Sequence, residues 1–292
     1  MKPAAFEYDD PATEDEALDL LARHGDECKV LAGGQSLVPL MNFRLARPAR
    51  LVDINGVESL GRIAVDGAGL RIGALVRHVE IERSREIARD WPLLSEAIGW
   101  VGHSQIRNRG TIGGSVAHAD PAAELPAAFA ALDATFHLRS RRGDRSLPWH
   151  EFFVSEFTTA TAPDELVVAV EVPRQKAATS SAFVEYARRH GDFALGGAAV
   201  TLELDAEGRC VNVAIALLSA GPRPVRATEA EQHLRGSRID EEAISAAAAT
   251  ATRGLRPTGD MHGSTEYRQQ LLEVMVKRAL TTAAHRARAA RQ

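Results

Sequence analysis

Two short segments of the chain each place a pair of glycines just before a hydroxyl side chain. The first is AGGQS, residues 32–36, and the second is TIGGS, residues 111–115. Glycine permits positive φ angles and a close approach of the backbone, so consecutive amide N–H groups can point at one anion. The hydroxyls of Ser36, Thr111 and Ser115 supply further donors. These residue types favour the binding of a phosphate or pyrophosphate by backbone dipoles, which requires no lysine.

Neither segment alone is specific, because a Gly-Gly pair most often marks a tight turn. Two such segments are better evidence, since they would hold one pyrophosphate from both sides. The chain lacks the G-x-G-x-x-G fingerprint of Rossmann folds and the G-x-x-x-x-G-K-[ST] loop of P-loop proteins. On the residues alone, a dinucleotide or phosphoanion site and a pair of structural turns both stay open.

Other kinds of chemistry have little support. His78-Val79-Glu80 lacks the downstream P-C-x-x-C of zinc deaminases, and His150-Glu151 lacks a second histidine four residues on. No G-x-S-x-G nucleophile elbow occurs. The sequence therefore predicts no metal site and gives no support to hydrolase chemistry.

The two cysteines, Cys28 and Cys210, lie far apart and outside any C-x-x-C pattern. This usage indicates neither a disulfide framework nor a thiolate-bound metal site, and it fits a reducing cytoplasm. The first twenty residues are acidic where a signal peptide needs an apolar stretch, and no 18 apolar residues run unbroken. We expect a protein that is neither exported nor membrane-spanning.

The overall composition is that of an ordered globular protein. The 292 residues are 45% hydrophobic and 25% charged, and their length suits two or three packed subdomains. The 35 Lys and Arg residues against 39 Asp and Glu residues give a net charge of -4. That balance disfavours binding to nucleic acids or to an anionic membrane.

The elements that must position the glycine segments can be read from periodicity and caps. Residues 13–23 predict a helix, with Thr13 and Glu16 in capping-box spacing, and strands are expected at 28–33 and 49–54, around the first segment. A strand at 70–76, helical periodicity at 77–89 and at 92–102, and strands at 135–140 and 165–173 belong to a second unit. In that unit Asp120 is expected to be the N-cap of an alanine-rich helix, with Pro121 at its first position.

A third unit follows the polar segment 174–181, which reads as a linker. Three antiparallel strands are predicted there at 182–189, 193–205 and 209–219, followed by helices near 227–235, 240–253 and 264–288. The predicted domains are an N-terminal α/β unit at 1–55, a second α/β unit at 56–176 and a C-terminal α+β domain at 177–292.

Four stretches together resemble one known family. They are residues 31–54 (LAGGQSLVPLMNFRLARPARLVDI), 105–128 (QIRNRGTIGGSVAHADPAAELPAA), 185–195 (EYARRHGDFAL) and 264–280 (STEYRQQLLEVMVKRAL). In this order and spacing they are similar to the FAD-binding medium subunit of molybdenum-containing hydroxylases, the family of xanthine dehydrogenase and aerobic carbon monoxide dehydrogenase.

The resemblance implies an α+β fold: a two-subdomain FAD-binding fold of the vanillyl-alcohol oxidase type, then an α+β domain with a three-stranded antiparallel sheet. It implies that both glycine segments wrap the FAD pyrophosphate and ribityl chain, that Glu124 accepts hydrogen bonds from sugar-like hydroxyls, and that Phe193 lies near the isoalloxazine. Many relatives have a lysine before the arginine pair, where this chain reads Glu185-Tyr186-Ala187. The cofactor-binding residues that the resemblance implies are Leu31, Ala32, Gly33, Gly34, Gln35, Ser36, Leu37, Val38, Val101, Thr111, Ile112, Gly113, Gly114, Ser115, Glu124, Val167 and Phe193.

The resemblance also implies a function and partners. The chain would be the FAD-binding, electron-transfer subunit of a heteromeric molybdenum hydroxylase. It would take electrons from [2Fe–2S] clusters of a small subunit, beside a large molybdopterin subunit, in a dimer of heterotrimers. Two cysteines are too few for an iron–sulfur cluster on this chain. A free-standing FAD-dependent oxidoreductase and a flavin-free scaffold are the alternatives, and the substrate and the electron acceptor stay open.

Overall fold

The computed structural model describes residues 2–290 and forms two compact units. Residue 1, which begins the first predicted domain, and residues 291–292, which end the third, lie outside the described residues. Unit 1 consists of Met1–Ile81, Ser104–His118 and Ala134–Pro173, and unit 2 consists of Glu82–His103, Ala119–Asp133 and Arg174–Gln292. Each unit therefore combines segments that are distant in sequence, and the division into three domains stays a prediction.

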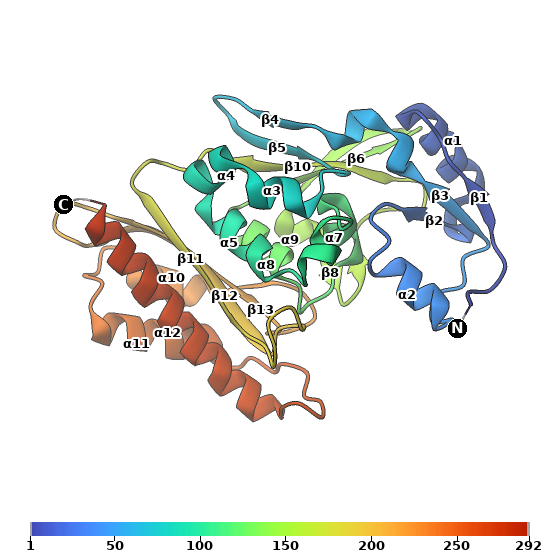
Figure 1. Ribbon diagram of the computed structural model, residues 1–292. Helices are drawn as coiled ribbons and strands as arrows, with labels where there is room; N and C mark the ends of the chain where they lie inside the picture. Colours follow the sequence, from blue (N-terminus) through green and yellow to red (C-terminus); the bar gives the residue numbers. More distant parts are fainter. Residues whose placement is uncertain (1, 291–292) are drawn as a thin grey trace. The chain divides into compact units, whose positions relative to one another are not determined.

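Unit 1 begins with a small parallel sheet, in which the strands predicted at 28–33 and 49–54 are joined by a third strand, β1, that the sequence pattern does not reveal. Its strands are β1 (Glu7–Asp9), β2 (Cys28–Leu31) and β3 (Arg50–Asp53), in the order β1-β3-β2 (Figure 1). Helix α1 (Glu14–His24) starts at Thr13, whose hydroxyl accepts from the Glu16 amide while the Glu16 carboxylate accepts from the Thr13 amide. The predicted capping box is confirmed.

The second sheet of unit 1 has the order β4-β5-β10-β6-β7 and is antiparallel throughout. Its strands are β4 (Ile63–Val65), β5 (Gly69–Gly73), β6 (Thr135–Ser140), β7 (Gly143–Pro148) and β10 (Leu166–Pro173). Short elements follow β7: α9 (Trp149–Phe152), β8 (Phe153–Ser155) and β9 (Thr158–Thr159). The predicted strands at 70–76, 135–140 and 165–173 are found as β5, β6 and β10.

The two glycine segments differ in secondary structure. The first is a turn between β2 and the short helix α2 (Leu37–Asn42), whereas Gly113 and Gly114 lie inside α7 (Ile112–His118), so the second pair occupies the first turn of a helix instead of a loop. The 3-10 helices η1 (Gly25–Glu27), η2 (Ile54–Gly56) and η3 (Glu58–Gly61) and the helices α3 (His78–Arg83) and α6 (Ser104–Arg107) complete the nearby connections.

Unit 2 is built on an antiparallel sheet of order β11-β12-β13-β14. Its strands are β11 (Thr179–Tyr186), β12 (Gly196–Leu204), β13 (Cys210–Leu218) and β14 (Val225–Arg226). The three predicted strands are confirmed, but β11 begins at Thr179, so the last three residues of the predicted linker 174–181 belong to a strand. The two-residue β14 adds a fourth strand that the sequence pattern does not reveal. The helices α10 (Thr228–Leu234), α11 (Glu241–Thr252) and α12 (Thr265–Ala289) begin and end within about two residues of the predicted ones.

Helices cover the sheet of unit 2, and one of its faces forms an apolar core with the C-terminal helices. Ala182, Val200 and Leu202 belong to one buried apolar cluster with residues of α10, α11 and α12. The long helix α12 lies along β11 and β12 (Figure 1). Helices α5 (Pro92–Trp100) and α8 (Glu124–Ala131) also contact the sheet, and α4 (Arg85–Asp90) contacts α5. None of the described helices combines the length and the apolar character of a membrane span.

The predicted start of the alanine-rich helix is wrong. Helix α8 begins at Glu124, with Ala123 as its N-cap. The Asp120 carboxylate instead accepts from the Ala122 amide, 2.9 Å away, and Ala119 has a φ of +50°. Asp120 therefore closes a turn of its own, which is the usual competitor of an aspartate N-cap.

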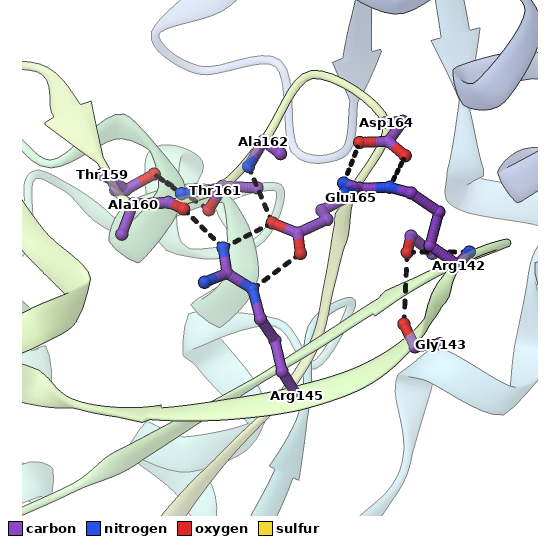
Figure 2. Close-up of polar contacts among 10 residues, drawn as sticks. Arg142, Gly143, Arg145, Thr159, Ala160, Thr161, Ala162, Asp164 and Glu165 are labelled. Carbon is purple, nitrogen blue, oxygen red and sulfur yellow. Dashed lines mark hydrogen bonds and ion pairs between the residues drawn. The ribbon is translucent and has the colours of Figure 1, made fainter.

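Two arginine–carboxylate pairs fix the approach to β10 (Figure 2). Arg145 of β7 binds the buried Glu165 in a bidentate pair at 2.6 and 2.7 Å, and the Ala162 amide donates to the same carboxylate at 2.7 Å. Next to it, Arg142 binds Asp164 at 2.6 and 2.7 Å. Burial acts to raise the pKa of Glu165, but these hydrogen bonds hold it below its ordinary value. The start of β10 is thus tied to the β6–β7 hairpin.

We expect Arg145→Met to destabilise the protein by about 1–2 kcal/mol, because it leaves the Glu165 carboxylate buried without its charged partner. Arg142→Met is the matched control, and it should cost less because its pair with Asp164 is mostly exposed on the arginine side. Urea unfolding of both variants measures the difference. Equal losses in the two variants would contradict this account of Glu165.

Candidate functional site

The two glycine segments meet in unit 1 at a point where no side chain fits. A Cβ atom at Gly33 would lie 2.5 Å from the Arg109 carbonyl oxygen and 2.9 Å from the Gly110 Cα atom. Both distances are below van der Waals contact, and both partners are backbone atoms that cannot swing aside. The residue at position 33 must therefore be glycine if the first segment is to lie against the chain that leads into the second.

A side-chain bridge holds the same two segments together. The Asn55 amide donates to the Ala32 carbonyl at 2.8 Å. Its oxygen accepts from Arg77 at 2.5 Å, and Arg77 also donates to the Arg109 carbonyl. One asparagine and one arginine thus connect the end of β2 to the segment before α7.

Hydrogen bonds from the backbone and the ring of His78 hold the second segment in place. Its backbone amide donates to Gly110 at 3.0 Å, and its Nε2 lies 3.0 Å from the Thr111 carbonyl and 3.1 Å from the Ser115 hydroxyl. Because a carbonyl only accepts, Nε2 must carry the hydrogen. The ring is 3% exposed, and its burial lowers the pKa of His78 to about 4. The imidazole is therefore neutral at physiological pH and acts as a structural donor.

The backbone amides of the two segments differ in whether they have a hydrogen-bond acceptor within the protein. In the second segment, Ile112 donates to Val76, Gly113 to Ala74, and Ser115 to the Thr111 carbonyl, while Gly114 donates to the Thr111 hydroxyl. Within residues 2–290, the amide N–H groups of 33–36 meet no protein acceptor. Loop 33–36 therefore presents a run of free donors, which is the property of a backbone anion site.

Two arginines add positive charge on this side of unit 1. Burial lowers the pKa of Arg77, and the nearby Arg109 charge lowers it further, against the opposing effect of the Glu80 and Asp53 carboxylates. An anion bound close to both would offset this repulsion. The residues present therefore fit the pyrophosphate of a dinucleotide, with loop 33–36 supplying the amide donors and the arginines supplying the field.

The remaining predicted residues of the first segment surround this loop. Leu31 ends β2, and Gly34 has a φ of +73° that bends the chain into α2. The Gln35 side-chain amide donates back to the Gly33 carbonyl at 3.1 Å, which stiffens the turn. Leu37 is the first residue of α2, and Val38 is 42% exposed.

The predicted residues outside the two segments are spread over both units. Val167 belongs to unit 1, where it is buried in β10 beside a bulge in the pairing with β6. Val101, Glu124 and Phe193 belong to unit 2. Val101 ends α5 and is half-buried, whereas Phe193 is 68% exposed in the connection between β11 and β12. The contacts of these four residues with FAD stay predictions.

Glu124 lies near a second buried carboxyl, Glu185 of β11. Burial raises the pKa of Glu124 to about 7, with Asp120 adding to the rise against a backbone hydrogen bond. Burial raises the pKa of Glu185 to about 9, and the Glu124 charge adds to it. Neither carboxyl oxygen of Glu185 has a hydrogen-bond partner in the described part of the chain. Unit 2 therefore holds a carboxyl that keeps its proton at neutral pH.

The sequence predicted no binding role for Asn55, Arg77 and His78 of unit 1 or for Glu185 of unit 2. Asn55, Arg77 and His78 act through long-range contacts, and no local pattern marks them. Glu185 lies in a strand whose successive side chains face opposite sides of the sheet, and it pairs with Gly197. This alternation is the signal from which its burial could have been inferred. Among the described residues, no group of three or more His, Cys, Asp or Glu side chains is arranged to hold a metal ion.

Comparisons with known proteins agree over the whole chain. Residues 4–175 match the FAD-binding domain in molybdopterin dehydrogenase, and residues 181–283 match the CO dehydrogenase flavoprotein C-terminal domain. The chain is 48% identical to the 6-hydroxypseudooxynicotine dehydrogenase complex subunit alpha of Paenarthrobacter nicotinovorans, over 99% of this chain and 97% of that protein.

Two solved structures are similar to the fold. Quinoline 2-oxidoreductase from Pseudomonas putida 86 has a chain 40% identical, with a TM-score of 0.94 and coverage of 98% of this chain and 99% of that one. Carbon monoxide dehydrogenase from Hydrogenophaga pseudoflava has one 37% identical, with a TM-score of 0.95 and coverage of 98% and 99%. The predicted two-subdomain FAD-binding fold with a C-terminal α+β domain is confirmed.

The buried carboxyl of Glu185 predicts an unusual pH dependence of stability. The unfolded chain ionises this group near its ordinary pKa of 4.5, while the folded chain holds the proton until about pH 9. The free energy of unfolding should therefore fall as pH rises between these values, by up to roughly 1.4 kcal/mol per pH unit. Glu185→Gln cannot ionise, so its stability relative to the parent chain should increase from pH 5 to pH 8.

Urea unfolding at three pH values in this range measures the difference. Glu273→Gln, on the exposed face of α12, gives the baseline for removing one surface carboxyl. Parallel curves for the parent chain and Glu185→Gln would mean that Glu185 is already ionised in the folded protein.

Proposed function

Because the chain belongs to the family of FAD-binding medium subunits of molybdenum hydroxylase complexes, we propose that it is the electron-transfer subunit of such a complex. It accepts electrons from [2Fe–2S] clusters of a partner subunit and passes them to an external acceptor. FAD supplies the redox chemistry when bound, and the protein binds and orients it. No side chain acts as a catalytic acid, base or nucleophile in this role.

One observation carries the assignment of the binding site. Loop 33–36 has free amide donors and lies against the Arg109–Gly110 backbone, with Arg77 and Arg109 beside it. These groups would hold the FAD pyrophosphate without a lysine. The second segment plays a different part in this proposal, because its amides from Ile112 to Ser115 already have protein acceptors, and the loop packs against the backbone that leads into it.

The proposed partners are a small iron–sulfur subunit and a large molybdopterin subunit, in a cytoplasmic dimer of heterotrimers. The cysteine content supports them. A [2Fe–2S] cluster takes about four ligands, mostly cysteines, whereas this chain has two, both buried and unpaired, one in each unit. The clusters and the molybdenum centre must then lie on other chains.

Gly33→Ala tests the binding site directly. Its methyl group would clash with the Arg109 carbonyl oxygen, so the loop must move away. The amide N–H groups of 33–36 would then no longer point at the pyrophosphate. We expect FAD affinity to fall by about tenfold or more, the equivalent of one lost charge-assisted hydrogen bond. The measurement is the FAD dissociation constant, from flavin fluorescence, with circular dichroism confirming that the variant is folded.

Gly61→Ala is the matched control in the same unit, because a Cβ atom at Gly61 meets nothing within 4 Å. This variant should bind FAD like the parent chain. Full FAD affinity in Gly33→Ala would remove the loop from the binding site.

The proposed role in a complex is tested by purifying the tagged chain from its native host. We expect two further chains to co-purify, with iron–sulfur absorbance and molybdenum in the same fraction. A lone chain that oxidises a substrate with its own FAD would instead establish the free-standing oxidoreductase.

A further inference from the structure

Unit 2 contains a cavity of about 220 Å³ that the proposed function does not use. It lies where the C-terminal end of α4 and the first turn of α5 meet the segment 174–177 and the strands β11 and β12. All of its lining residues belong to unit 2. Because the glycine segments belong to unit 1, this cavity is built from residues other than those of the pyrophosphate loop.

Two hydroxyl side chains from neighbouring strands line the cavity. Ser181 of β11 and Thr201 of β12 are direct cross-strand partners, so their side chains lie side by side on the same face. Both are buried, with exposed fractions of 5% and 6%. The Ser181 hydroxyl has no hydrogen-bond partner among the described residues. A buried hydroxyl left unpaired costs free energy, so it indicates a site that a ligand completes.

The nine-residue helix α5 opens onto the same cavity. It starts at Pro92, and its N-cap, Trp91, makes no side-chain capping bond. Within residues 2–290, the Leu93 amide finds no acceptor. The positive end of the helix dipole and a free amide therefore face a cavity that already contains an unpaired hydroxyl.

Cationic side chains surround this end of the helix. Three of the lining residues, Arg89, Arg174 and Lys176, are basic, and only Asp90 is acidic. The Arg174 guanidinium lies 6.0 Å from the centre of the Trp91 ring, which holds it over the cavity wall. Asp90 and Glu203 pair with Arg89 and Lys176 at 2.7 and 3.0 Å. These pairs hold the two cations in place and partly offset their charge.

We propose that this cavity binds a small oxyanion, a phosphate or the carboxylate of a small organic acid. The Ser181 hydroxyl and the Leu93 amide would donate to the oxyanion, and Arg174 would balance its charge. The ligand would also fasten segment 174–177, the connection between β10 and β11, to the start of α5. This inference does not depend on FAD binding.

Isothermal titration calorimetry of the FAD-saturated full chain tests the proposal, with sodium phosphate and sodium acetate in separate arms at constant ionic strength. We expect saturable binding of one anion per chain, and the arms show whether phosphate or carboxylate is preferred. Ser181→Ala and Arg174→Met should each weaken binding by about tenfold, because each removes a hydrogen bond or a charge that acts on an anion. Amide hydrogen exchange in 174–179 should slow on binding.

Two controls separate this site from other effects. Arg253→Met removes an exposed arginine of unit 2 outside the cavity and should bind the anion like the parent chain. Gly33→Ala should also bind it normally, so a failure of the FAD assignment would not be mistaken for a failure here.

Three results would overturn the proposal. One is the absence of saturable binding in both arms, and another is equal affinity in the parent chain and Ser181→Ala. The third is binding by the free chain that disappears in the assembled complex, which would make the cavity a contact for an acidic side chain of a partner subunit.

Discussion

The close approach of Gly33 to the backbone of Arg109 and Gly110 is the constraint on which the site of unit 1 depends. Two segments more than seventy residues apart can touch there only because position 33 has no side chain. Ala74 and Val76, which follow the end of β5, accept the amides of Gly113 and Ile112, so α7 is anchored beside the second sheet. Loop 33–36, which follows β2 of the first sheet, is then set against it. The two sheets of unit 1 are joined at the place where an anion would bind.

This arrangement gives two similar sequence motifs opposite roles. The amides of residues 33–36 in AGGQS have no acceptor among the described residues, while in TIGGS the amides of residues 112–115 donate to Ala74, Val76 and Thr111. Residue types alone cannot distinguish the two cases, because both satisfy the same requirement for small residues and hydroxyls. Which amides are free depends on what each segment packs against, and that is decided by Asn55, Arg77 and His78. The residue types thus left an anion site and a pair of structural turns both open, and they did not reveal that the two segments differ in which amides are free.

The same reasoning explains which parts of the fold were predictable. Helix α1, the strands β11 to β13 and the three C-terminal helices have clear periodicity, α1, α11 and α12 also have side-chain N-caps, and all of them were found within a few residues. Asp120 is not the predicted N-cap because its carboxylate accepts a hydrogen bond from the Ala122 amide, within a turn that precedes the helix. Strand β14 has only two residues and exists through its pairing with β13. Elements fixed by local patterns were predictable, whereas elements fixed by a distant partner were not.

The sheet of unit 2 shows how buried polarity can indicate function. One face, packed on α10, α11 and α12, is apolar. The alternate residues of β11 include Ser181 and Glu185, both buried and both with oxygen atoms that lack partners in the described residues. Alternation along a strand places both side chains on one face, four residues apart. Unpaired polar groups are costly inside a fold, and a purely structural face would replace them with apolar residues. Their retention on the same face, and not on the one that packs against α12, is the pattern expected where ligands or protons complete the structure.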